Sequence, residues 1–179
     1  TPSDLEVFAK GFSLSEGILH SLNELYSLDI SQTELGIQVD MTVSSRAFMA
    51  LKEHRRIMIG RTGCGLCGVE SLKQLYANLP VVNTSVSSIW LNQIPNAIAQ
   101  LKVRQKISEL TGGAHAAAWV VKGQIVALFE DVGRHNALDK LIGNYFINGE
   151  INLEKFILLL SGRASFELIQ KAAMANIKT

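Results

Sequence analysis

Both cysteines of the chain, Cys64 and Cys67, lie in the stretch GCGLCG at residues 63–68. A C-x-x-C pair brings two thiols within reach of each other or of one metal ion. Three uses are open: half of a metal site, a redox pair, or a thiol that carries a chemical group. Several glycines surround the pair, and glycine is costly inside a packed element. Two buried and inert thiols therefore fit the pattern poorly.

Positive charge precedes the pair, at Lys52, Arg55, Arg56 and Arg61. Nearby cations favour the thiolate and lower a cysteine pKa from its ordinary value of about 8.5. The same charges attract an anionic substrate, although in isolation a charge run is usually a solvated helix face. Beside a C-x-x-C pair, they predict a nucleophilic cysteine, either Cys64 or Cys67.

The metal and redox uses find less support. A structural zinc site needs about four ligands, and the remaining ligand candidates are the four histidines, His20, His54, His115 and His135. None of them stands at a close ligand spacing from the cysteines, so we expect no structural metal. Gly63 precedes the pair where thioredoxin-like pairs usually carry an aromatic residue.

A second polar cluster, FEDVGRHNALDK, interrupts an apolar background at residues 129–140. Asp131 is placed to cap a helix that begins near Gly133, and helix N-termini suit phosphates. Arg134 would then be a bidentate phosphate ligand in the first turn. Asp139 follows His135 by one turn and is expected to orient its imidazole or pair with it. Capping and salt bridges alone would explain Asp131 and Lys140. We predict a ligand site formed by Arg134, His135, Asn136, Asp139 and Lys140.

A third cluster, LLLSGRASFE, again places a glycine turn and an arginine before a predicted helix. Its candidate ligand residues are Ser161, Gly162, Arg163 and Ser165, with Ser165 as the helix cap. Together the two clusters predict one anionic pocket, suited to a nucleotide or a pterin-type phosphate. His115, which opens a strand after two glycines, is either a structural histidine or a further member of this site.

The elements that position these clusters are predicted from hydrophobic spacing and turn residues. The expected elements are a helix from Pro2 to about Leu19, a strand at 34–43, helices at 45–56 and 69–79, a helix at 95–113, a hairpin at 115–130 turning at Lys122–Gly123, a helix at 136–147, a central strand at 156–161 and a last helix at 165–177. The second half alternates helices with strands, which is typical of an α/β layered sheet. We predict a smaller lobe at 1–80 that carries the cysteine loop, and an α/β core at 81–179.

Length, composition and charge limit the class of protein. The 179 residues are 47% hydrophobic, include three prolines and carry a net charge of +1. These values favour a folded globular domain and exclude a strongly basic nucleic-acid binder. No apolar run has the roughly 18 residues needed to cross a bilayer, so we expect no membrane contact. Two closely spaced cysteines favour a reducing cytoplasm. The chain starts and stops abruptly in predicted helices, which suggests a fragment.

Five stretches, in this order, resemble the FdhD/NarQ family of formate dehydrogenase accessory proteins. They are TPSDLEVFAKGFSLSEGI, GCGLCG, TGGAHAAA, EDVGRHNALDKLIG and LSGRASFELIQKAA. The resemblance implies a single FdhD-type domain with a cytidine-deaminase-like α/β fold that forms a homodimer. Family members carry further sequence before the first stretch and after the last. The zinc signature of the deaminases is missing, because alanines follow His115 and no P-C-x-x-C motif comes later.

The resemblance also implies a sulfur carrier. Such proteins take sulfur from a cysteine desulfurase as a persulfide and pass it to the molybdenum cofactor, bis-molybdopterin guanine dinucleotide, for formate dehydrogenase. The persulfide carrier corresponds to Cys64, supported by Cys67. Two alternatives stay open: a cofactor-binding chaperone for formate dehydrogenase whose thiols do no chemistry, and a zinc-dependent nucleotide deaminase.

Overall fold

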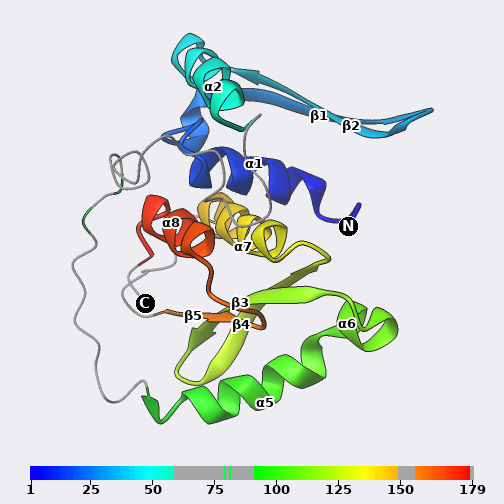
Figure 1. The fold of residues 1–179 in the computed structure, drawn as a ribbon, viewed down its shortest axis with the longest axis vertical. Helices are drawn as coiled ribbons and strands as arrows, with labels where there is room; N and C mark the ends of the chain where they lie inside the picture. Colours follow the sequence, from blue (N-terminus) through cyan, green and yellow to red (C-terminus); the bar gives the residue numbers. More distant parts are fainter. Residues whose placement is uncertain (59–78, 80, 82–90, 149–155, 178–179) are drawn as a thin grey trace.

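The computed structural model describes residues 1–58, 79, 81, 91–148 and 156–177. The cysteine loop and the helix predicted at 69–79 lie outside these residues. Figure 1 shows the described part as a sheet between helices, with a long hairpin and one further helix beyond them.

The central sheet contains β3 (His115–Val121), β4 (Gln124–Asp131) and β5 (Ile157–Leu160) in the order β4-β3-β5. The predicted turn joins β3 to β4, with positive φ angles of 48° at Lys122 and 75° at Gly123, as a type I′ turn requires. Strand β3 is antiparallel to both neighbours, so β4 and β5 run in the same direction. The sequence prediction that β5 is central was wrong for the described sheet. Strand β3 lies in the middle, with β4 paired on one side and β5 on the other.

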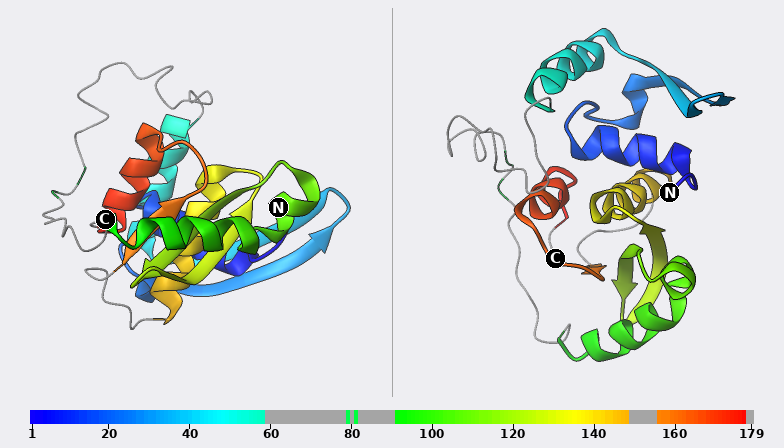
Figure 2. Two further views of the ribbon diagram at one scale, coloured as in Figure 1. Left: turned by 90° about the horizontal axis from the view of Figure 1, so that it is seen from below. Right: turned by 45° about the vertical axis from the view of Figure 1, so that its right-hand side comes forward.

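Helices cover both faces of this sheet (Figure 2). One face packs against α7 (Arg134–Asn148), with α8 (Phe166–Met174) beside that helix, and the other packs against α5 (Ile94–Arg104). Alternate residues of β3 lie on opposite faces of the sheet. Ala117 and Trp119 belong to the core with α7, whereas the intervening residues, Ala116, Ala118 and Val120, pack with α5. This two-sided burial explains why β3 is apolar throughout from Ala116 to Val121.

The helix predicted at 95–113 is divided in two. Helix α5 ends at Arg104, and α6 (Lys106–Thr111) follows after Gln105, whose ψ of 76° is not helical. The two carboxylate oxygens of Glu130 accept hydrogen bonds from the backbone N–H groups of Ile107 and Ser108, at 2.8 and 2.9 Å. A cap from β4 therefore starts the second helix, and this long-range contact is invisible to local spacing.

The first helix, α1 (Leu5–Ser15), is shorter than predicted at both ends. Asp4 is its N-cap, with φ of 55°, and Gly17, with φ of 70°, follows its C-terminus. Leu14 and Leu19 join the core that α7 forms with the sheet. The first twenty residues therefore contribute to the same core as the second half of the chain.

The segment after α1 forms η1 (Leu22–Glu24), then the antiparallel pair β1 (Leu25–Thr33) and β2 (Gly36–Val43), and then α2 (Ser45–Met58). Strand β1 was not predicted from the sequence. Leu35, which belongs to the strand predicted at 34–43, is fully exposed at the hairpin tip. Within the described ranges, no helix has the length and apolar character that crossing a membrane requires.

Candidate functional site

The predicted polar clusters meet at one edge of the central sheet. Because β4 and β5 run in the same direction, their carboxyl ends lie on either side of the start of β3. His115 pairs with Asp131 across the β3–β4 ladder. On the other side, Ser161 donates its backbone N–H to the carbonyl oxygen of Ala116 at 3.0 Å. Antiparallel pairing on both sides of β3 thus brings His115 together with the second and the third polar cluster.

Asp131 organises the start of α7. Its Oδ1 accepts hydrogen bonds from the Gly133 N–H at 3.0 Å and the Asn136 amide at 3.2 Å. Its Oδ2 lies 2.8 Å from Nζ of Lys140, and both side chains are 1% exposed. Burial by itself would raise the pKa of Asp131, but the hydrogen bonds from Lys140 and Gly133 outweigh it and lower the pKa to about 2. Asp131 therefore holds the turn that leads into α7 through the N–H of Gly133 and binds the side chain of Asn136, rather than a backbone N–H of the helix itself.

Arg134 is the first residue of α7. Its Nε is buried and has no hydrogen-bond partner among the residues that the structure describes. Buried polar groups are nearly always satisfied, so an orphaned guanidinium nitrogen at a helix N-terminus needs an acceptor. An anionic oxygen would satisfy both the nitrogen and the positive end of the helix dipole.

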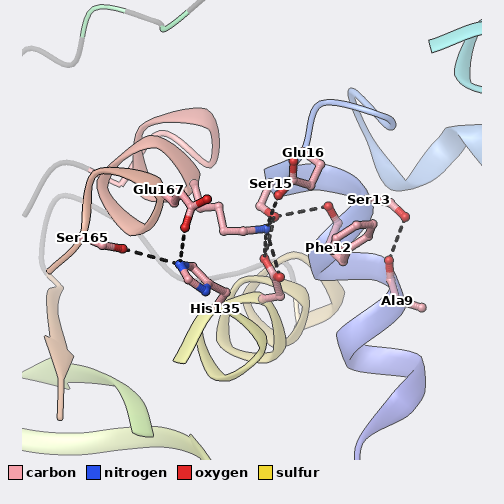
Figure 3. A network of polar contacts seen from close by, with 10 residues as sticks. Ala9, Phe12, Ser13, Ser15, Glu16, His135, Ser165 and Glu167 are labelled. Carbon is pink, nitrogen blue, oxygen red and sulfur yellow. Dashed lines mark hydrogen bonds and ion pairs between the residues drawn. The ribbon is translucent and has the colours of Figure 1, made fainter. Parts of the chain in front are cut away.

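His135 connects the starts of α7 and α8 (Figure 3). Its Nε2 lies 2.9 Å from Oε2 of Glu167 and 3.5 Å from Oγ of Ser165. Burial, assisted by the charges of Arg134 and Lys171, lowers the pKa of His135 despite the opposing effect of Glu167. The imidazole is therefore neutral at pH 7, and the contact with Glu167 requires the proton on Nε2.

The Ser161–Ser165 turn is held against β3. Oγ of Ser161 accepts a hydrogen bond from the Ala116 N–H at 2.7 Å. A Cβ on Gly162 would lie 3.1 Å from Nδ1 of His115, so only glycine lets the turn pass this ring without displacement. Arg163 is exposed. Ser165 is the N-cap residue of α8 as predicted, but its side chain makes no capping hydrogen bond and faces His135 instead.

Asp139 does not pair with His135, contrary to the sequence prediction. It is 1% exposed, accepts a hydrogen bond from Ser15 Oγ at 2.6 Å, and both its oxygens lie 3.0 Å from Nζ of Lys171. Burial raises the pKa of Asp139 although Lys171 opposes the shift. The buried carboxylate needs a cation, and α8 supplies it. Figure 3 shows this network joining α1, α7 and α8.

Asp139 and Lys140 are therefore interior residues, and the prediction that they contact a ligand is corrected. Lys140 is 1% exposed, and its ammonium group contacts Asp131, the Glu130 carbonyl oxygen at 3.3 Å and Ser3 Oγ at 3.4 Å. Neither side chain can reach a ligand without breaking a buried ion pair. The remaining candidates, which line or approach the shared edge, are His115, Arg134, His135, Asn136, Ser161, Gly162, Arg163 and Ser165.

A cavity of about 820 Å³ opens beside this edge, between α5, α6 and β5. Apolar side chains such as Ile98, Leu101 and Leu159 form part of its lining, and the polar part includes Lys102, Glu109 and, at its border, Ser161. A bulky ligand held at the turn after β5 has room to extend into this cavity.

The comparison with protein families decides where this chain belongs: the model of the FdhD/NarQ family matches residues 1–179. The chain belongs to the FdhD/NarQ family. It is 52% identical over 177 residues to the "Sulfur carrier protein FdhD" of Acinetobacter baylyi, covering 99% of this chain and 64% of that protein. It is 47% identical over 174 residues to the protein of the same name from Cupriavidus necator, covering 97% of this chain and 60% of that protein. The chain thus spans less than two thirds of the length of these curated relatives.

A solved structure supports the fold. A crystal structure from Desulfotalea psychrophila, described as a candidate formate dehydrogenase accessory protein, matches 98% of this chain and 62% of its own, with a TM-score of 0.65 at 20% identity. At that identity the likeness concerns the fold alone, a mixed α/β arrangement with small antiparallel sheets.

The two cysteines of this FdhD/NarQ chain, Cys64 and Cys67, lie outside the described residues. Their predicted roles therefore stay predictions. In the part of the chain that the structure does cover, no three His, Cys, Asp or Glu side chains are grouped so as to hold a metal ion.

Sequence reasoning missed the partners that organise this FdhD/NarQ site, namely Glu167, Lys171 and Ser15. A signal for Lys171 exists, because it shares the apolar spacing of Leu168 and Ala175 and so stands where a helix buries its side chains. A charged residue on such a stripe indicates a buried partner. For Glu167 and Ser15 the local sequence offers no comparable signal.

Proposed function

We propose that this chain is a cytoplasmic sulfur carrier with sulfurtransferase activity. Cys64 accepts sulfur as a persulfide from a cysteine desulfurase and delivers it to bis-molybdopterin guanine dinucleotide, the cofactor destined for formate dehydrogenase. The names of the Acinetobacter and Cupriavidus relatives support the carrier role, and membership of the family supports the link to formate dehydrogenase.

Loading of the carrier is a thiol exchange. The thiolate of Cys64 attacks the outer sulfur of the desulfurase persulfide. A new S–S bond forms at Cys64, the old S–S bond breaks, and the desulfurase cysteine leaves as a thiolate. The outer sulfur keeps its oxidation state, so this step needs no oxidant or reductant. Cations before the loop, Lys52 among them, favour the attacking thiolate.

Delivery of the outer sulfur as sulfide needs two electrons, and Cys67 supplies them. Its thiolate attacks Sγ of Cys64, the bond from Cys64 to the outer sulfur breaks, and sulfide leaves toward the cofactor. The product is a Cys64–Cys67 disulfide, which a dithiol reductant must reopen before the next cycle. Because only two residues separate the cysteines, such a disulfide closes a small loop. In this cycle Cys67 acts as the resolving thiol.

The observation that carries the cofactor part of the proposal is the unpartnered Nε of Arg134. It lies at the start of a 15-residue helix, beside the point where His135 contacts the first turn of α8. Two helix N-termini and two arginines, Arg134 and Arg163, together suit the phosphates of a guanine dinucleotide. The buried nitrogen and the donors around it fit an anionic guest.

The remaining residues of the edge position that guest. Neutral His135, held by Glu167, keeps the two helix starts together. Glycine at position 162 keeps the turn close to His115 and leaves the backbone accessible. The cavity beside Ser161 offers apolar surface for the ring systems that the phosphates carry with them.

The finer features that the family resemblance implies belong to the same proposal. They are a cytidine-deaminase-like order of layers, a single domain and a homodimer. The order of the predicted elements adds a smaller lobe at 1–80 that carries the cysteine loop. The sheet with helices on both faces is compatible with the first of these.

Transfer of labelled sulfur tests the carrier against the chaperone. The chain is loaded with ³⁵S from labelled cysteine by a desulfurase, freed of donor, and mixed with formate dehydrogenase that holds unsulfurated cofactor. No dithiol is added, because a dithiol would strip the persulfide and a single turnover takes its two electrons from Cys67. The proposal predicts that ³⁵S moves to the dehydrogenase and that formate oxidation appears, whereas Cys64→Ala supports neither. Equal activation by Cys64→Ala without label transfer would establish the chaperone instead.

A further inference from the structure

The imidazole of His135 is held by one of its two nitrogens. Nε2 lies 2.9 Å from Oε2 of Glu167 and 3.5 Å from Oγ of Ser165, and Figure 3 shows both contacts meeting at this atom. Because the contact with Glu167 takes the proton on Nε2, the lone pair of the neutral ring is on Nδ1. His135 can therefore accept a second proton, at Nδ1, without giving up its contact with Glu167.

The charged groups around His135 come from three helices. They are Arg134 and Asp139 on α7, Glu167 and Lys171 on α8, and Glu16 at the end of α1. Lys171 is already compensated, because its ammonium group lies 2.6 Å from Glu16 and 3.0 Å from Asp139. Nε of Arg134, in contrast, is buried without a partner among the residues that the structure describes. Of the two cations beside His135, Arg134 is therefore the one whose charge a guest would compensate.

An anion bound by Arg134 would reverse the electrostatic balance at His135. In the free protein, burial, assisted by the charges of Arg134 and Lys171, holds the pKa of His135 below its ordinary value of 6.5, against the effect of Glu167. Arg134 and His135 are adjacent at the N-terminus of α7. A phosphate at Arg134 compensates one opposing cation and adds negative charge near the ring, and negative charge favours the protonated imidazole. The guest therefore raises the pKa of His135.

We propose that His135 couples guest binding to a proton: a phosphate-bearing guest binds at Arg134 together with one proton, which His135 takes from solvent. The inference rests on the proposed function, because it assumes that Arg134 and the turns beside it hold the phosphates of the guest. The protonated ring keeps its contact with Glu167 and gains a positive charge and a second N–H donor. The coupling is reciprocal, so the guest leaves more readily when the proton is lost.

The direction of the pH dependence follows from this coupling. His135 binds more protons in the complex than in the free protein, so the gain in affinity is fully present below the pKa of the free protein. The gain is lost as the pH rises through the higher pKa of the complex. Affinity should therefore be greater in mildly acidic than in mildly alkaline solution.

Titration calorimetry with GDP-mannose tests the coupling. Both phosphates of this probe are esterified, as in a dinucleotide, so its own charge stays constant between pH 5.5 and pH 8. Repeating the titration at pH 6 in buffers that differ in ionisation enthalpy counts the protons taken up with the ligand. The wild-type chain is expected to take up a measurable fraction of one proton, and to bind about five- to tenfold more tightly at pH 5.5 than at pH 8.

Two substitutions assign the proton. His135→Gln leaves an amide that can donate to Glu167 but cannot titrate, so it should take up no proton and bind equally at both pH values. Glu167→Gln removes the charge that favours the imidazolium, so its gain in affinity should move to lower pH. A merely structural role of Glu167 would instead weaken binding equally at every pH. The matched control is His20→Gln, because His20 is exposed and contacts Arg46 outside the site.

The possible results separate this inference from the proposed function. Binding of GDP-mannose without proton uptake, or unchanged uptake in His135→Gln, would overturn the inference and leave the phosphate site in place. No binding by the wild-type chain would overturn both the phosphate site and the coupling. Formation of a persulfide at Cys64 depends on neither result.

Discussion

Gly11 of α1 and Gly143 of α7 meet where the two helices cross. A Cβ on Gly11 would lie 2.6 Å from the backbone nitrogen of Gly143, and a Cβ on Gly143 would lie 2.9 Å from that of Gly11. The helices therefore touch through their backbones, with no room for a side chain at either position. This approach places Ser15 against Asp139 and fixes α7, whose first turn holds the candidate ligand residues.

Replacing either glycine should separate the two helices. Gly11→Ala and Gly143→Ala are each expected to lower the free energy of unfolding by about 2–4 kcal/mol, because the added methyl group forces the backbones apart. Urea denaturation followed by circular dichroism measures the change. Gly113→Ala is the matched control, since its Cβ would meet only the Thr111 carbonyl oxygen at 3.9 Å. Equal stability of all three variants would show that the crossing tolerates side chains.

The buried pair of Asp139 and Lys171 should show strong coupling. Lys171→Met leaves a buried carboxylate without its cation and is expected to cost about 3–5 kcal/mol. The double variant Asp139→Leu/Lys171→Met removes both buried charges, so part of that loss should return. The recovery is partial because Lys171 also lies 2.6 Å from Oε1 of Glu16. Denaturation of the single and double variants measures the coupling. Additive effects of the two substitutions would mean that the pair contributes nothing as a pair.

Stability below pH 4 should report on Asp131. Its folded pKa of about 2 lies below the ordinary value of 3.8, so the carboxylate stabilises the fold above that ordinary value. This contribution, about 2 kcal/mol, is lost as the pH falls from 4 through 2. The stability difference between wild type and Asp131→Asn should therefore shrink over that interval. A difference that stays constant from pH 7 to pH 2 would contradict the low pKa.

Arg134 should contribute directly to binding an anionic guest. With GDP as a probe for the guanine nucleotide part of the cofactor, calorimetry is expected to show about 10- to 100-fold weaker binding by Arg134→Gln. Arg134→Lys should recover little, because an ammonium group cannot replace a guanidinium fork. Lys10→Gln serves as the control, because Lys10 lies on α1, pairs with the exposed Glu6 and belongs neither to the candidate site nor to the lining of the cavity. Equal affinity of Arg134→Gln and this control would remove Arg134 from the site.

Local signals predicted much of the second half of the fold. The Lys122–Gly123 turn, the apolar β3 and the helices α7 and α8 each follow from neighbouring residues, and all four are present. Strand β1 was missed because LYSLDISQT alternates weakly and carries several polar residues. Helix α5 was predicted too long because the break depends on Glu130, which lies more than twenty residues further along the chain.

The sequence predicted the turns before α7 and α8 that form the candidate site, but not the contacts among their polar side chains. The spacing of four residues predicted a contact between Asp139 and His135. In the structure the buried carboxylate of Asp139 pairs with Lys171, 32 residues away in the sequence. Both Asp139 and Lys140 looked like surface ligands because polar residues favour exposure, yet each is buried with an opposite charge. The convergence of the turns at one sheet edge follows from strand direction, which local sequence does not specify.

The most direct test of the account is the intact mass of the chain after incubation with a cysteine desulfurase and cysteine. A persulfide adds one sulfur atom, about 32 Da, at the thiol that the preceding cations activate. We expect this gain for the wild-type chain and for Cys67→Ala, its reversal by a dithiol, and no gain for Cys64→Ala. An unchanged wild-type mass, or the same gain in Cys64→Ala, would contradict it.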